Sequence, residues 1–261
     1  LSTLLVLGAC DDGDSNNVNN VNNVNNVNNV NNVNNVNNVN NVNNTNNTNN
    51  TTVWTPPPGT SWQWQLSTYP VQTWLDVTMY DIDLFDVADT TLETLTADGR
   101  IIICYFSAGS YEDWREDASD FPAETIGQPL DEWPGEYWVD VRASAIRSII
   151  ETRLDMAVAR GCDGVEPDNI DGYVNDTGFS LTYADQLDFA LFLADAAHTR
   201  GLSVGLKNNG DQIPELVSVF DWALNEECVA WDECDRLSVF TGAGKAAFHV
   251  EYVDDWSDAP A

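Results

Sequence analysis

The chain has 261 residues, of which 42 are Asp or Glu and 10 are Lys or Arg, so its formal net charge is −32 at pH 7. This acidic excess disfavours a nucleic-acid partner, because the phosphates would be repelled. It is compatible with a cationic ligand or with adaptation to a salty medium, and composition does not separate the two.

The first ten residues are apolar, end in small residues and stop at a cysteine. Leu7-Gly8-Ala9-Cys10 resembles the lipobox that ends a bacterial lipoprotein signal peptide. We therefore expect residues 1–10 to be a signal remnant with Cys10 as the lipidated residue. The protein would then be anchored to the bacterial cell envelope or surface, in contact with the membrane only through its lipid. The alternative is a short buried segment.

Residues 11–53 form a low-complexity linker in which Asn-Asn-Val and then Asn-Asn-Thr repeat. Charged and aromatic residues are almost absent after Ser15, so the stretch cannot supply a hydrophobic core. We expect a disordered spacer that holds the following domain away from the membrane. A stacked β-solenoid and an aggregation-prone tract are the alternatives.

Residues 54–256 suit one domain with its own core, in which strand-like and helical patterns alternate. Helical patterns cover residues 90–98, 143–160, 183–200 and 212–219. This alternation predicts an α/β fold, a closed (β/α)₈ TIM barrel, with an open doubly wound sheet as the alternative. The expected strands cover residues 63–66, 75–80, 101–106, 137–141, 164–166, 203–206, 222–224 and 246–250.

The stretch from Gly161 to Tyr173, GCDGVEPDNIDGY, is unusually rich in carboxylates. Pro167 cannot donate to a sheet ladder and favours an extended conformation at the residue before it, so we expect the strand to end there. Asp168 and Asn169 would then point into the loop mouth, where α/β barrels carry their catalytic residues.

A second acidic strand end, Glu226, completes a candidate catalytic pair with Asp168. Two carboxylates from different strands, one protonated and one ionised, are the minimum apparatus for cleaving a glycosidic bond. Each has a structural explanation when taken alone, since Asp168 could cap a turn and Glu226 could pair with Lys207. Their joint place in a barrel mouth favours catalysis. Glu227 could replace Glu226, because adjacent strand residues face opposite sides.

Polar residues near other strand ends are candidates for binding a substrate. Lys207 could lower the pKa of a nearby carboxylate or bind a sugar hydroxyl. Asp81 and Asp83 alternate on one strand and share a face, although capping of the next helix is an equal explanation. The full candidate set is Asp81, Asp83, Tyr105, Ser107, Glu166, Asn169, Asp171, Lys207, Asn208 and Glu251.

Four cysteines follow Cys10. We expect Cys228 and Cys234 to form a disulfide across a short loop, while Cys104 and Cys162 are either a second pair or buried thiols. No cysteine or histidine spacing is typical of zinc, so no metal is expected. Nucleotide-binding and serine-hydrolase motifs are also absent from the sequence, so no cofactor is expected.

Five segments together resemble the endo-α-1,4-polygalactosaminidases, glycoside hydrolase family 114, over residues 62–252. They are YDIDLFD at 80–86, ICYFSAGS at 103–110, GCDGVEPDN at 161–169, GLKN at 205–208 and NEEC at 225–228. The resemblance implies a TIM barrel that hydrolyses α-1,4-linked galactosamine polymers, with Asp168 and Glu226 as the catalytic pair. Glu116 and Asn209 depart from the family pattern, where we expect Pro and Asp.

The polymer implied by this resemblance is a cationic aminosugar polysaccharide, which carboxylates would attract. We expect a monomer with this polysaccharide as its partner. Our hypothesis for the reaction is a retaining double displacement with Asp168 as nucleophile and Glu226 as acid/base. One alternative is a non-catalytic surface lectin or adhesin, and another is a hydrolase of a different aminosugar polymer.

Overall fold

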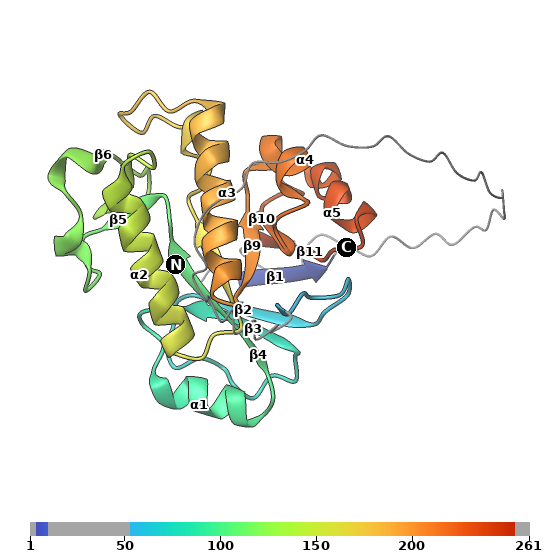
Figure 1. Cartoon of the computed structure of the whole chain (residues 1–261). Helices are drawn as coiled ribbons and strands as arrows, with labels where there is room; N and C mark the ends of the chain where they lie inside the picture. The colour runs from blue at the N-terminus through green and yellow to red at the C-terminus, as the bar shows by residue number, and fades with distance from the viewer. Residues whose placement is uncertain (1–3, 10–52, 254–261) are drawn as a thin grey trace, which may run out of the picture. The chain divides into compact units, whose positions relative to one another are not determined.

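The computed structural model describes residues 4–9 and 53–253 (Figure 1). The predicted linker and Cys10 lie outside these residues. The strands are β1 Leu4–Ala9, β2 Trp62–Gln65, β3 Met79–Asp83, β4 Ile101–Ser107, β5 Ser110–Glu112, β6 Ile126–Pro129, β7 Glu136–Val139, β8 Gly164–Asp168, β9 Ser203–Lys207, β10 Trp222–Glu226 and β11 Ala247–Val253. The helices are α1 Asp89–Ala97, α2 Ser144–Ala159, α3 Tyr183–Thr199, α4 Ile213–Leu216 and α5 Ser238–Gly242, with short 3-10 turns η1 Ala118–Asp120, η2 Ala123–Thr125, η3 Gly172–Val174, η4 Gly210–Gln212 and η5 Cys234–Leu237.

The main sheet is curled and mostly parallel, with strand order β1-β11-β10-β9-β8-β4-β3-β2. Strands β2, β3, β4, β8, β9, β10 and β11 run parallel in this order. Strand β1 pairs antiparallel with β11, so the segment expected to end a signal peptide is a strand here. Helices such as α2 and α3 lie outside the sheet (Figure 1). This is the predicted α/β architecture of the TIM-barrel class.

One predicted barrel strand lies elsewhere. The run at 137–141 corresponds to β7, which joins β5 and β6 in a separate three-stranded antiparallel sheet of order β5-β7-β6. Strand β4 pairs directly with β8 instead, from Ile103 opposite Gly164 to Ser107 opposite Asp168. A short apolar run indicates a strand but not its partners, which explains the wrong assignment. We call residues 108–143, which carry this small sheet, the insertion.

The strands separate two apolar clusters. One contains residues from the strands and from helices α1 to α5, and it lies between the sheet and its helical cover. The other contains Trp62, Met79, Ile103, Trp222, Leu224, Phe248 and related strand residues and no helix residue, so it fills the inside of the curl. A Cβ on Gly205 would lie 2.4 Å from the buried Trp222 ring, so only glycine fits beneath that ring. This packing forms an apolar floor below the carboxyl ends of the strands.

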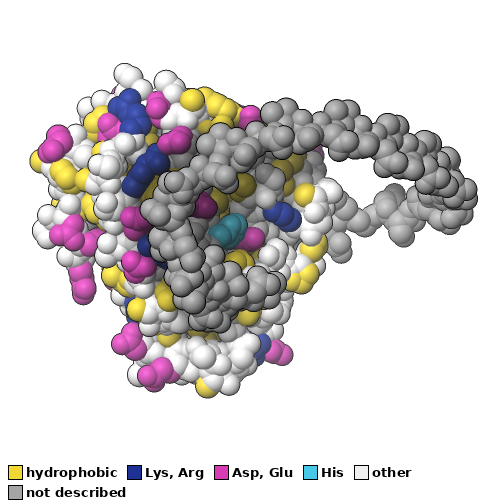
Figure 2. Space-filling model, in the orientation of Figure 1, with side chains coloured by type: hydrophobic (Ala, Val, Ile, Leu, Met, Phe, Trp, Pro, Cys, Tyr) yellow, Lys and Arg dark blue, Asp and Glu magenta, His cyan; other side chains and the backbone are white. Residues whose placement is uncertain are grey.

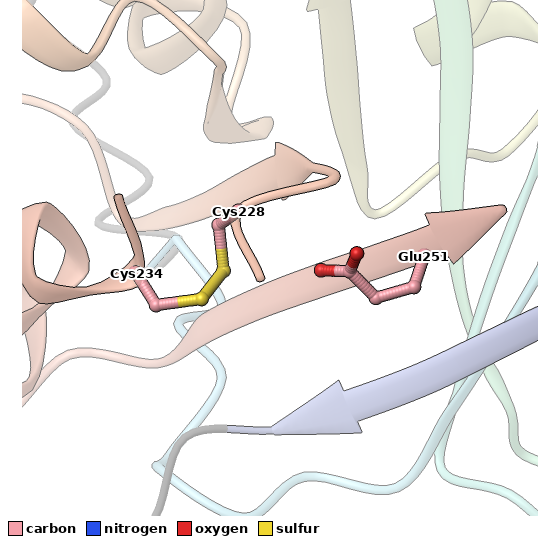
Figure 3. A group of neighbouring side chains, drawn as sticks. All are labelled: Cys228, Cys234 and Glu251. Atoms are coloured by element: carbon pink, nitrogen blue, oxygen red, sulfur yellow. A yellow bond between two sulfur atoms is a disulfide. The ribbon is translucent and has the colours of Figure 1, made fainter. Parts of the chain in front are cut away.

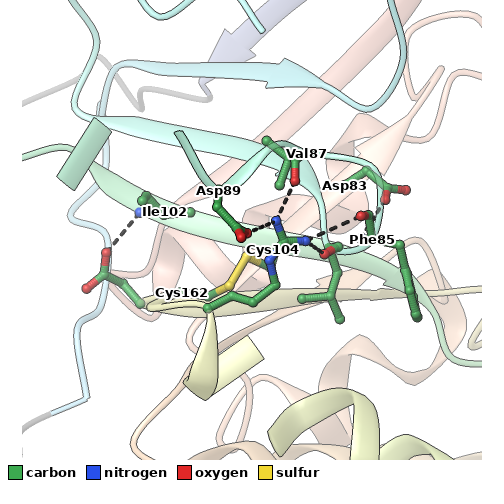
Figure 4. Close-up of a disulfide and its surroundings, with 10 residues drawn as sticks. Asp83, Phe85, Val87, Asp89, Ile102, Cys104 and Cys162 are labelled. Carbon is green, nitrogen blue, oxygen red and sulfur yellow. Dashed lines mark hydrogen bonds and ion pairs between the residues drawn. A yellow bond between two sulfur atoms is a disulfide. The ribbon is translucent and has the colours of Figure 1, made fainter. Parts of the chain in front are cut away.

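Two disulfides fix the loops around the sheet. Cys104 in β4 is bonded to Cys162, just before β8 (Figure 4), which settles the pairing that the sequence left open. Next to this bond, Ile102 N donates to Asp163 Oδ2 at 2.9 Å. Cys228 and Cys234 are bonded as expected. None of the described helices combines the length and apolar character that crossing a membrane requires.

Candidate active site

The carboxyl ends of β8, β9 and β10 meet around one buried cation, Lys207. Its Nζ lies 2.6 Å from Glu166 Oε1, 3.3 Å from Asp168 Oδ2 and 3.4 Å from Glu226 Oε2. Strand β9 lies between β8 and β10, and the alternation of side chains along each strand turns all four residues to the inside of the curl. The two carboxylates that the sequence paired are therefore brought to one site.

Asp168 accepts hydrogen bonds from three sides. Tyr105 Oη donates to its Oδ2 at 3.1 Å, and the backbone N of Asn169 donates to its Oδ1 at 2.7 Å. Lys207 supplies the third contact, at Oδ2. Three donors on this partly exposed carboxylate fix its orientation.

Glu226 has a matching set of donors. Asn208 Nδ2 donates to Oε2 at 3.1 Å, Tyr252 Oη donates to Oε1, and the backbone N of Glu226 donates back to Asn208 Oδ1 at 3.0 Å. Burial opposes the charge on Glu226, but Lys207 and the bonds from Tyr252 and Asn208 outweigh it and lower the pKa of this carboxyl. Glu226 is therefore ionised in the resting site.

Beneath this pair lies a fully buried carboxyl group. Glu166 binds Lys207 through Oε1 and accepts from Trp64 Nε1 at 2.9 Å through Oε2. Burial, and then the charge of Glu166, raise the pKa of the neighbouring Asp81 well above its ordinary range. Neither carboxyl oxygen of Asp81 receives a hydrogen bond from a donor group in the described part of the chain. Asp81 is thus a neutral acid, which leaves Lys207 paired with Glu166, Asp168 and Glu226.

The three strands β8, β9 and β10 are each followed by a left-handed residue. Asn169 follows Asp168 with φ 58°, Asn208 follows Lys207 with φ 48°, and Glu227 follows Glu226 with φ 59°. Asn tolerates this conformation better than most residues, whereas Glu does not. The sharp turn ends each strand directly after its functional side chain, and Glu226, not Glu227, contacts Lys207.

A pocket of about 260 Å³ opens beside Glu226. Burial, and then the charge of Asp168, raise the pKa of its lining residue Asp171 to about 6. Arg236 neutralises part of the rim through contacts of 2.7 Å to Asp211 and 3.5 Å to Glu233. Asn225 Oδ1 is buried against the pocket without a hydrogen-bond donor among the described residues. The lining is completed by Tyr173, Val174, Asn208, Asn209, Gly210, Glu226 and Trp231.

Two candidate substrate-binding residues are occupied by structural contacts. Asp83 is buried and binds Arg115 of the insertion at 2.7 Å, an ion pair that strand spacing could not reveal. Glu251 accepts from Val229 N at 3.0 Å and from His249 Nδ1 at 3.2 Å. It lies beside the Cys228–Cys234 disulfide (Figure 3), whose sulfurs are bonded to each other and are not free to ligate a metal as thiolates.

Three residues that contact this region, Trp64, Glu136 and Tyr252, were not predicted from the sequence. Tyr252 and Trp64 could have been found by counting alternate strand positions, because Phe248 and Val250 face the inside of the curl and Tyr252 follows the same period. Tyr252, one position after the predicted Glu251, is the residue that contacts Glu226. Glu136 could not have been found this way, since it comes from the insertion.

Ser107, Asn169 and Glu136 form a separate group beside Asp168. Asn169 Nδ2 donates to Ser107 Oγ at 2.8 Å and to Glu136 Oε1 at 3.1 Å.

On the surface, acidic side chains are spread over the face shown in Figure 2. This agrees with the composition of the chain, in which 42 Asp and Glu outnumber 10 Lys and Arg.

The chain matches one family model and two curated relatives. A model of the glycoside-hydrolase family GH114 matches residues 43–261. An uncharacterised protein of Thermotoga maritima is 25% identical over 187 residues, which cover 62% of this chain and 58% of that protein. An uncharacterised protein of Methanocaldococcus jannaschii is 25% identical over 195 residues, which cover 64% and 56%. The chain thus spans less than two thirds of the length of these curated relatives.

Two solved structures also match the chain. Aspergillus fumigatus Ega3, solved in complex with galactosamine, is 49% identical with a TM-score of 0.74, and the match covers 76% of this chain and 79% of that chain. The glycoside hydrolase domain of PelA from Pseudomonas aeruginosa is 15% identical with a TM-score of 0.53, covering 72% and 79%. At that identity, the second match shows a shared fold.

The role of Lys207 can be tested without a substrate. Replacing Lys207 with Met should lower the free energy of unfolding by about 3–5 kcal/mol, because buried carboxylates lose their counter-ion. It should also raise the pKa of Glu226, since Lys207 lowers it in the native protein. Denaturant titration and carboxyl ¹³C NMR measure the two effects.

The control variant Lys245→Met removes the chain's other lysine and should leave the pKa of Glu226 unchanged. An unaltered Glu226 pKa in the Lys207 variant would contradict this account.

Proposed function

The chain belongs to the glycoside-hydrolase family GH114, and from this premise we propose that it cleaves an α-1,4-linked, galactosamine-containing polysaccharide. The observation that carries the proposal is the convergence of Asp168 and Glu226 on Lys207. The 49% identity to Ega3, whose structure holds galactosamine, supports the aminosugar. Binding alone would not require two carboxylates placed across a common cation.

The charge of the site supports a cationic substrate. One lysine faces Glu166, Asp168 and Glu226, so the site keeps a net negative charge when all three are ionised. Asp171 adds a further acidic group at the pocket. An ammonium group on a sugar would be attracted into this field, and the attraction would weaken as salt screens it.

We propose a retaining double displacement. The shared partner at 3.3 and 3.4 Å keeps Asp168 Oδ2 and Glu226 Oε2 within about 7 Å of each other, a bound that includes the separation of about 5 to 5.5 Å typical of retaining enzymes. Asp168, held by Tyr105, Asn169 and Lys207, suits the nucleophile.

The proposed reaction has two steps. An Asp168 oxygen attacks the anomeric carbon while the bond to the glycosidic oxygen breaks, and Glu226 gives its proton to that oxygen. Glu226 then takes a proton from water as the water oxygen attacks the same carbon and releases Asp168. Because Lys207 lowers the pKa of Glu226, the protonated form needed first is most populated at acid pH.

Conservative variants test the catalytic pair. Asp168→Asn and Glu226→Gln each keep the shape of the site but remove a carboxylate, and we expect each to lower polymer cleavage by at least about 100-fold. Release of reducing ends, with products sized by chromatography, measures this. Asp176→Asn, a change at an exposed residue of a nearby loop, should cleave normally. Normal cleavage by either catalytic variant would remove that residue from the mechanism. Binding of the polymer by the native protein without cleavage would favour the lectin alternative.

A panel of polymers tests the substrate class. Deacetylated galactosamine polymers should be cut faster than fully acetylated ones, because only free amines are cationic, and the advantage should shrink as NaCl is raised. Glucosamine polymers of matched acetylation serve as controls for sugar identity. Equal rates on acetylated and deacetylated chains at low salt would overturn the proposed role of charge.

We also propose that the enzyme is a lipid-anchored monomer of a bacterial cell envelope, with residues 11–53 as its spacer. The lipobox Leu7-Gly8-Ala9-Cys10 supports this. Mass spectrometry of the mature N-terminal peptide should find a lipid on Cys10. A mature protein that retains residues 1–9, or that carries an unmodified Cys10, would contradict the anchor.

A further inference from the structure

Glu136 lies next to the proposed nucleophile although it belongs to the insertion. It begins β7, is only 6% exposed, and sits opposite Glu112 in the antiparallel pairing of β5 with β7. Neither the reaction proposed above nor the family resemblance gives it a role. A buried carboxyl group beside a catalytic one requires an explanation.

Glu136 is the acceptor of a small hydrogen-bond network, the Glu136 network, made of Ser107, Ser110, Glu136 and Asn169. Its Oε1 accepts from Ser110 Oγ and from Asn169 Nδ2, the latter at 3.1 Å. Asn169 Nδ2 also donates to Ser107 Oγ at 2.8 Å, and the two serine hydroxyls contact each other. Arg153 Nη1, buried on α2, donates to the carbonyl of Ser107 at 2.6 Å and anchors the network from behind.

The network holds Asn169 in the left-handed conformation, φ 58°, that directs its backbone N to Asp168 Oδ1 at 2.7 Å. The backbone N atoms of Ala108 and Gly109 donate to the carbonyl of Asp168 at 2.9 and 3.1 Å. A Cβ on Gly109 would lie 1.7 Å from the carbonyl oxygen of Asn169, so only glycine permits this approach. The insertion therefore packs directly against the residue pair that carries the nucleophile.

We propose that Glu136 is a positioning residue, which orients the carboxylate of Asp168 by fixing the side chain of Asn169. The inference rests on the proposed role of Asp168 as nucleophile. Glu136 does not touch the reacting atoms. Its effect is geometric, and small displacements of a nucleophile lower the rate of a chemical step strongly.

The protonation of Glu136 makes its contact with Asn169 measurable. Burial raises its pKa to about 7 although the hydrogen bond from Ser110 opposes this rise; the charges of Glu112 and Asp168 raise it further, and Arg115 lowers it. The charge of Glu136 also acts on Tyr105, whose pKa burial and the nearby carboxylates raise. Above pH 7 the ionised carboxylate is the stronger acceptor for Asn169 and Ser110. The backbone amide of Asn169 should therefore report a titration near pH 7.

Three variants test the proposal on the whole protein. Glu136→Ala removes the acceptor and should lower kcat by about 10-fold or more with little change in KM, since Asp168 is misplaced but the substrate contacts remain. Glu136→Gln keeps an acceptor oxygen and should retain most of kcat. Glu124→Gln, an exposed change in the same insertion, is the matched control and should behave as the native protein.

Amide NMR separates positioning from a merely structural role. The Asn169 amide shift should show a step near pH 7 in the native protein and lose that step in Glu136→Gln. Persistence of the step in Glu136→Gln, or an unchanged kcat in folded Glu136→Ala, would overturn the proposal. Equal loss of kcat in the Gln and Ala variants would also overturn it, because the retained acceptor would then have no effect.

Two failures, a Glu136→Ala variant that does not fold and a native protein that does not cleave the polymer, can be told apart. If Glu136→Ala does not fold, Ser110→Ala removes one bond to the same Oε1 and should lower kcat, and an unchanged kcat there would count against the network. If the native protein cleaves no galactosamine polymer, the proposed function fails. The Asn169 titration still tests the link between Glu136 and Asn169 in that case.

Discussion

The structure depends on one buried ammonium group shared by three carboxylates. A lysine that is 1% exposed is tolerated only when opposite charges compensate its loss of hydration. Lys207 obtains them because β9 lies between β8 and β10, so one inward-facing residue of β9 reaches acids on both neighbours. The apolar floor that includes Trp222 and Leu224 lies below these contacts. Strand order, packing and charge therefore all favour the observed position of Lys207 Nζ.

This arrangement places like charges close together, which costs stability, and the protein offsets the cost locally. Tyr105, Tyr252 and Asn208 donate to the paired acids, and Asp81 holds its proton instead of adding another charge. Local rules of stability are commonly broken at functional sites. The residues after Asp168 and Glu226 have a left-handed backbone conformation, whose strain also costs stability at this site.

Much of the fold and part of the site follow from periodicity. Helical spacing located α2 and α3, and Gly161 marked the end of α2 with φ 79°. Strand ends identified Asp168, Lys207 and Glu226, because parallel strands deliver their last residues to one rim. Contacts between distant segments could not be predicted from spacing. The pairing of Asp83 with Arg115 and the approach of Glu136 to Asn169 both depend on how the insertion folds back.

The Cys104–Cys162 bond closes a loop with a sequence separation of 58 residues that includes the whole insertion and α2. In a chain-entropy account, a closure of this length removes roughly 4 kcal/mol of freedom from the unfolded ensemble. Glutathione-rich compartments keep thiols reduced, whereas the periplasm and the cell surface allow such bonds to persist. A chain produced in a reducing cytosol would lose this tether between β4, which carries Tyr105, and β8, which carries Asp168. The redox state of the compartment in which the chain folds is thus coupled to how firmly the Asp168 carboxylate is held.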